Sequence, residues 1–132
     1  MAMTVKDIYD SAIRLLAEST NAVDNEDYEE RAPYLVAIFC SEECSTDAAL
    51  RRLHGHEQIT YSDSVYMGLE ESFPLLSSLA PAAAYYLAAM LVIDDNVELS
   101  DKLYEKYCDS MSRLCESIPA VSERICDRYN LR

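Results

Sequence analysis

Two groups of residues have types and spacing suited to chemistry, and the first consists of cysteines and histidines. Cys40 and Cys44 are one helical turn apart, and His54 and His56 follow as an H-x-H pair. Thiolates and imidazoles are ligands that zinc prefers. However, the spacing matches no common structural zinc finger, and Cys40 follows Phe39 on a face expected to be buried, where cysteine acts as a small apolar residue. We therefore predict no metal site and no cofactor.

The second group consists of carboxylates at one-turn spacing. Glu26, Glu29 and Glu30 lie close together, and Glu98 and Asp101 form an E-x-x-D pair. Magnesium binds carboxylates together with phosphate oxygens, and helical NTP pyrophosphatases place such pairs on two helices. Acidic residues are also favoured in the first turn of any helix by its dipole, and the chain has no basic cluster for phosphates. An all-α, Mg-dependent NTP pyrophosphatase-like enzyme is therefore the alternative function.

Other catalytic signatures are missing from the sequence. A cysteine or serine nucleophile would need a neighbouring base, and the only histidines are the H-x-H pair on an expected loop. The two glycines, Gly55 and Gly68, stand alone, so no glycine-rich phosphate loop is present. We predict that the protein is not an enzyme and has no catalytic residues.

The charge of the chain limits its partners. The formal net charge is −13 and the sequence pI is about 4.4, which disfavours specific binding to nucleic acid or to an anionic membrane surface. Such an acidic chain could also be a helical protein-interaction module that docks on a basic partner. The five cysteines are an odd number and no leader pattern opens the chain, so we expect a reduced, cytoplasmic protein.

The apolar spacing predicts a single helical domain over residues 1–132. Thr4 is a candidate N-cap for the first helix, Pro33 is expected to kink or restart the second, and Gly55 is expected to end the third. Ser77 or Ser78 is the candidate cap of the fourth helix. The expected helices cover 5–18, 25–43, 46–53, 78–93 and 97–118. Residues 119–132 could form one last helix or an extended segment.

One of these helices is apolar on every side. Residues 79–93 carry no charge and no polar group except two tyrosine hydroxyls. Such a helix must be buried, and it is shorter than the roughly 20 residues that span a bilayer. We therefore expect it to form the centre of the bundle, with the other helices packed around it.

The segment 56–73, here called the arm, lacks helical periodicity. It alternates and contains β-branched and aromatic residues, which favours an extended or hairpin-like insertion. Apolar side chains on a long loop need a covering surface, either the parent domain or a neighbouring subunit. We predict an inter-subunit contact made by Ile59, Tyr61, Val65, Tyr66, Met67, Leu69 and Phe73.

A family resemblance rests on residues 73–114. The progression runs F-P-L, then L-x-P-A-A-x-Y-Y-L-A-A, then Y-x-x-Y before a distal leucine, and it is preceded by TVKDIYDSAIRLLAE and DYEERAPYLVAIF. The ending IPAVSERICDRYN adds to it. In this layout the chain resembles the small helical head–tail connector proteins (adaptor or head-completion proteins) of tailed phages and prophages.

The resemblance implies a structural role without catalysis. Subunits of that family form a ring on the portal, extend the DNA exit channel and receive the tail, so the implied partners are further copies of the chain, the portal and tail proteins. DNA would pass through the ring without specific binding, and the implied location is the host cytoplasm and the virion neck. The fold expected is all-α, a small bundle of four to five helices with the arm as its insertion.

Overall fold

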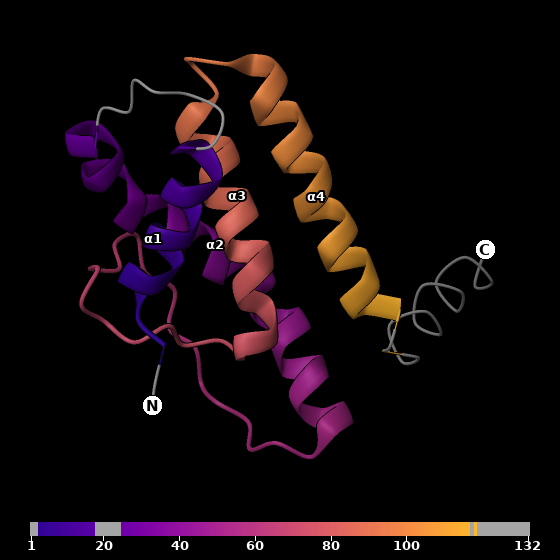
Figure 1. The fold of residues 1–132 in the computed structure, drawn as a ribbon. Coiled ribbons are helices and arrows are strands. Elements are labelled where there is room, and N and C mark those ends of the chain that lie inside the picture. The colour runs from indigo at the N-terminus through magenta and orange to yellow at the C-terminus, as the bar shows by residue number, and fades with distance from the viewer. Residues whose placement is uncertain (1–2, 18–24, 117, 119–132) are drawn as a thin grey trace, which may run out of the picture.

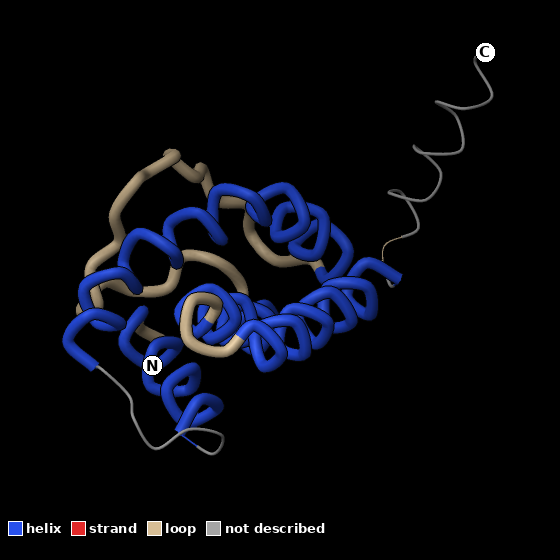
Figure 2. Tube along the Cα trace, turned by 90° about the horizontal axis from the view of Figure 1, so that it is seen from above, coloured by secondary structure: helices blue, strands red, loops and turns tan. Residues whose placement is uncertain are grey.

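The computed structural model describes residues 3–17, 25–116 and 118, and this part of the chain is an all-α bundle (Figure 1). The fold class predicted from the sequence is therefore confirmed. The helices are α1 (Val5–Ala17), α2 (Asn25–His54), α3 (Ala80–Val92) and α4 (Val97–Glu116), with a 3₁₀ turn η1 (Ser77–Leu79) leading into α3. Figure 2 shows these helices joined by loops, without a strand among the described residues.

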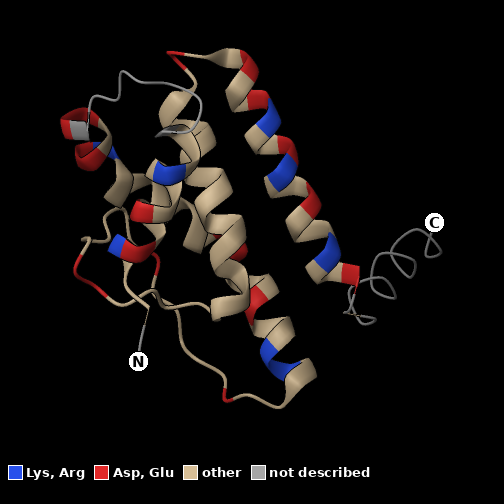
Figure 3. Ribbon diagram, in the orientation of Figure 1, with Lys and Arg blue, Asp and Glu red and all other residues tan. Residues whose placement is uncertain are grey.

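Helix α3 is the centre of the bundle, as predicted. It contacts α1, α2 and α4, and Figure 3 shows it without a charged residue between α1 and α4, which both carry charges. Leu87, Ala88 and Leu91 are fully buried. The small alanines of this helix let its neighbours approach on every side, which explains why so short an apolar helix can hold the bundle together.

The entry into α3 differs from the prediction. Neither Ser77 nor Ser78 caps it, because the chain first makes the 3₁₀ turn and Leu79 becomes the N-cap without a side-chain hydrogen bond. Pro81 falls in the first turn, where its missing N–H would have no helical partner anyway. The turn thus replaces a serine cap as the device that starts the helix.

Helix α1 begins with the expected cap and is joined to the arm. The Asp7 N–H donates to Thr4 Oγ1 and the Thr4 N–H donates to Asp7 Oδ2, a reciprocal capping box. The N–H groups of Val5 and Lys6 donate to carbonyls at the far end of the arm. Free N–H groups at the start of a helix are commonly satisfied in this way, so this end of the arm is fixed to α1.

Helix α2 is one continuous helix, so the separate helix expected over 46–53 was wrong, as was the restart at Pro33. The polar run between Phe39 and Asp47 contains no glycine or proline, and the Thr46 hydroxyl bonds Glu43 inside the helix. The Pro33 carbonyl accepts a hydrogen bond from the arm. The helix ends at Gly55 in the left-handed region (φ 74°), as predicted.

Helix α4 confirms the helix predicted over 97–118 and carries an apolar stripe along it. Leu103 and Tyr107 are buried, and Met111 packs against the core from a half-buried position. The helix ends at Glu116, two residues earlier than predicted, and the Ile118 side chain is still buried. The prediction for 119–132 lies outside the described residues. No helix in the described part of the chain is both apolar and long enough to cross a lipid bilayer.

Candidate functional site

The cysteines and histidines considered for zinc are not assembled into a site. Cys40 is buried in the core, and burial raises the pKa of its thiol to about 12. The Cys44 Sγ instead contacts the Ser41 carbonyl at 3.4 Å. His54 and His56 are exposed at the end of α2, with ring centroids 6.4 Å apart. Within the described ranges, no three histidine, cysteine or acidic side chains lie close enough to hold a metal ion.

The carboxylates considered for magnesium are likewise spread over two exposed surfaces. Glu26, Glu29 and Glu30 are exposed in the first turns of α2, whereas Glu98 and Asp101 are exposed on α4. None of them belongs to a potential metal-binding group in the part of the chain that the structure describes. Their positions agree with the preference of acidic residues for the beginnings of helices.

The arm is anchored at both ends by one buried ion pair of α2. Asp47 is 2% exposed, and its Oδ2 accepts a 2.8 Å hydrogen bond from Arg51 Nε. The guanidinium also donates to the carbonyls of Glu57, at the start of the arm, and Pro74, just beyond its end. The other carboxylate oxygen, Oδ1, accepts from the Leu76 N–H at 2.8 Å. In this arrangement, here called the clasp, the two charges pair with each other and each side chain also bonds the backbone, as a buried ion pair requires.

Part of the predicted contact surface instead packs inside the protein's own core. Met67 and Phe73 are buried, and Leu69 and Tyr61 are half-buried against the core. Burial raises the pKa of the Tyr61 hydroxyl. The Phe39 and Phe73 rings stack at 6.5 Å between centroids. These four arm residues are therefore largely covered by the parent domain, which was the other possibility for apolar side chains on this loop.

The remaining arm residues point outward. Val65 is 81% exposed, and Tyr66 and Ile59 are exposed as well. The Tyr66 ring packs edge-on against the ring of Tyr34 on α2, with centroids 5.1 Å apart, and the Ser64 hydroxyl donates to the Tyr66 carbonyl at 2.7 Å. The tip of the arm is thus held in a defined position while its apolar side chains remain uncovered.

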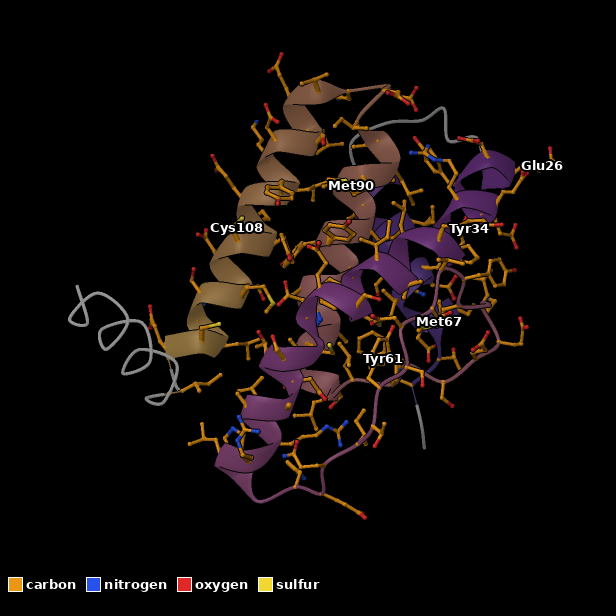
Figure 4. All side chains as sticks on the ribbon, turned by 180° about the vertical axis from the view of Figure 1, so that it is seen from behind. Glu26, Tyr34, Tyr61, Met67, Met90 and Cys108 are labelled. Carbon is orange, nitrogen blue, oxygen red and sulfur yellow. The ribbon has the colours of Figure 1, made fainter. Side chains whose placement is uncertain are left out.

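Of these exposed side chains, Val65 borders a groove between α2 and the arm. The α2–arm groove has a volume of about 500 Å³ and is lined by Tyr34, Ile38, Ser41 and Glu42 of α2 and by residues 63–65 of the arm. Figure 4 shows Tyr34 on the side of α2 that is turned away from α4. No lysine or arginine lines the groove, and its charged members, one on each wall, are both acidic.

The sequence did not identify the α2 side of this groove. Ile38 and Tyr34 are 45% and 51% exposed, and neither was among the residues predicted to make a contact. A signal was present, because Glu30, Tyr34, Ile38 and Glu42 follow each other at intervals of four residues and therefore share one face of a helix. The acidic residues at both ends of that row mark it as a solvent-facing row.

Comparisons with known proteins add no relative to this description. No protein-family model, no curated protein and no solved structure matched the chain.

Proposed function

We propose that the protein is a structural assembly subunit, a phage or prophage head–tail connector that oligomerises on the portal and joins head to tail. The resemblance over residues 73–114 supports the connector family, and the α2–arm groove supplies a surface for the assembly. The observation that carries the proposal is the arm tip, where Val65 and Tyr66 are exposed although the arm is anchored at both ends.

An uncovered apolar tip on a fixed loop favours a binding role. Contiguous apolar patches on a soluble surface commonly mark interaction sites, and a loop that is already ordered loses little conformational entropy on binding. Burying the Val65 side chain alone would stabilise a complex by about 1.5 kcal/mol. The chain offers this gain without rearranging its core.

The helical body has the rigidity that a ring subunit needs. The Tyr28 hydroxyl donates to Asp95 Oδ2 at 2.7 Å, which joins the first turn of α2 to the α3–α4 loop. Arg31 donates to the carbonyls at the end of α3. The Tyr107 hydroxyl donates to Glu43 Oε2 at 2.7 Å and joins α4 to the middle of α2. These bonds connect α2 to α3, to α4 and to the loop between them, so the α2 wall of the groove is fixed relative to the rest of the bundle.

The test compares assembly of two matched variants. Val65→Asp places a charge on the arm tip, and Val97→Asp makes the same change at a site on α4 that is 59% exposed. We expect light scattering and electron microscopy to show rings of the wild-type chain, alone or with the portal protein of the same phage. Val65→Asp should weaken assembly by at least about tenfold, a loss of roughly 1.4 kcal/mol, whereas Val97→Asp should assemble like wild type.

Two results would count against the connector. One is equal assembly of Val65→Asp and wild type, which would remove the arm tip from the interface. The other is a chain that hydrolyses NTPs with Mg²⁺ and loses that activity when Glu98 and Asp101 are replaced by glutamine and asparagine. A monomer in the absence of portal protein does not decide the question, because connector subunits can assemble on the portal.

A further inference from the structure

The charge of the chain is divided unevenly along its length. Residues 119–132 carry three arginines and two acidic residues, which makes this segment net positive by one charge. The chain as a whole is at −13, so the residues before it carry −14. The segment is therefore attracted to the rest of a second copy at low ionic strength.

The pattern of this segment matches the α2–arm groove. Its arginines, at 124, 128 and 132, are spaced by four, and so are the apolar residues at 121, 125 and 129. On a helix this spacing would put an apolar row beside a basic row. The groove offers the opposite arrangement, since Ile38 and Val65 form apolar walls beside the carboxylates of Glu42 and Asp63.

We propose that residues 119–132 of one copy bind in the α2–arm groove of a second copy. In this contact the apolar row covers Ile38 and Val65, and the arginines lie against Glu42 and Asp63. The inference rests on the proposed function, because it names the partner of the same groove. It goes further in giving the contact a direction, from the end of one copy to the side of the next.

That direction determines the kind of assembly. The C-terminal end of α4 lies on the opposite side of the bundle from Tyr34 (Figure 4). A contact between two different surfaces of the same chain is heterologous, so it repeats from copy to copy and closes into a ring when the rotation permits. A symmetric dimer would instead use the same surface twice and would stop at two copies.

A second groove of similar size among the described residues is a poorer match for this segment. It lies between α1 and α3, has a volume of about 510 Å³ and includes Arg14 together with Asp7. A basic side chain in the wall would repel the arginines of the segment. The α2–arm groove, whose charged lining is acidic only, is therefore the better site.

The first experiment measures binding to a full-length chain whose own segment is disabled. The receptor carries Arg124→Glu and Arg128→Glu, and the probe is a fluorescein-labelled peptide of residues 119–132. We expect saturable, salt-sensitive binding by fluorescence anisotropy. Adding Glu42→Lys and Asp63→Lys to the receptor should weaken binding about tenfold, since it replaces two exposed attractive charge pairs, each of modest strength, by repulsive ones. Glu105→Lys with Asp109→Lys, the same charge change on exposed α4 positions, should leave binding within twofold.

The second experiment follows assembly of full-length chains by sedimentation velocity over a range of concentrations. Wild type should self-associate, and Arg124→Glu with Arg128→Glu should abolish this. The Glu42→Lys, Asp63→Lys variant alone should also fail to assemble, whereas a mixture of the two variants should regain assembly. In the mixture the arginines of one variant meet the native acidic groove of the other, and the introduced glutamates meet the introduced lysines, a rescue that only a contact between the segment of one copy and the groove of another predicts.

Several results would overturn the inference. Peptide binding that does not respond to Glu42→Lys with Asp63→Lys would exclude the groove as the site. A wild-type chain that stays monomeric and excludes the peptide, while the reversed-segment variant binds it, would mean that the segment occupies its own groove. Assembly that Val65→Asp abolishes but arginine reversal leaves intact would refute the inference and leave the proposed function standing.

Discussion

Replacing Arg51 should destabilise the protein by more than the loss of its three hydrogen bonds alone would predict. Arg51→Met keeps the length of the side chain but removes the ion pair with Asp47 and the bonds to the carbonyls of Glu57 and Pro74. Asp47 would remain as a buried carboxylate, held only by the Leu76 N–H. Removing one partner of a buried ion pair costs about 3–5 kcal/mol.

The lower part of that range applies here because the Arg51 side chain is 13% exposed, so water can reach the vacated space. A loss of about 3 kcal/mol is a large part of the stability of a small domain. It should lower Tm by roughly 10–15 °C for a domain of this size. Urea unfolding followed by circular dichroism, with a common m-value for all variants, measures the change in unfolding free energy directly.

A double-mutant cycle sharpens the test. Asp47→Asn should destabilise the wild-type protein, but it should stabilise the Arg51→Met variant, because it removes the uncompensated charge and keeps an acceptor for the Leu76 N–H. Arg52→Met is the control, since Arg52 is the neighbouring residue and is exposed; it should change stability by no more than about 0.5 kcal/mol. Equal effects of Arg51→Met and Arg52→Met would refute the reasoning that the clasp is a buried charge pair.

Three further predictions concern titration, reactivity and backbone conformation. Burial and the hydrogen bond to Asp95 raise the pKa of Tyr28 from 10.0 to about 12. The contribution of this tyrosine to stability is therefore complete below pH 10 and is lost as the pH rises toward 12. Urea unfolding across this window should show a smaller decline in the free energy of unfolding for Tyr28→Phe than for wild type. Burial raises the pKa of Cys40 to about 12, so mass spectrometry after brief thiol labelling at pH 8 should find the exposed Cys108 modified and Cys40 unmodified. Gly55 has a positive φ with open space around its Cα, so Gly55→Ala should cost about 1 kcal/mol from backbone strain alone, measured by thermal unfolding.

The parts of the fold that follow local rules could be predicted from the sequence. The apolar run before Asp94 requires burial on every side, and α3 contacts all three other helices. The Thr4–Asp7 capping box and the glycine end of α2 follow from the chemistry of these residues at helix ends. In each case the sequence signal lies within one or two turns of the structure that it determines.

Features that depend on tertiary partners could not be predicted in this way. The polar run before Asp47 has the composition of a turn, yet α2 continues through it. Asp47 itself is buried, and its burial depends on two partners, Arg51 and Leu76, which lie four and 29 residues further along the chain. The arm has no repeating pattern, so nothing local distinguishes Met67, which faces the core, from Val65, which faces solvent. The Met67 N–H bonds the Pro33 carbonyl, and this long-range contact fixes which arm residues turn inward.

The clasp and the groove are connected through the arm. Arg51 holds the arm at residues 57 and 74, and Met67 is fixed between these points by its bond to Pro33. The exposed tip at Val65 is therefore ordered before any partner arrives, and ordering a free loop on binding would otherwise reduce affinity. It follows that Arg51→Met, far from the groove, should weaken assembly at temperatures where the protein is still folded. The exposed Arg52→Met control should assemble like wild type, and equal assembly of the two variants below their unfolding temperatures would show that the clasp serves stability alone.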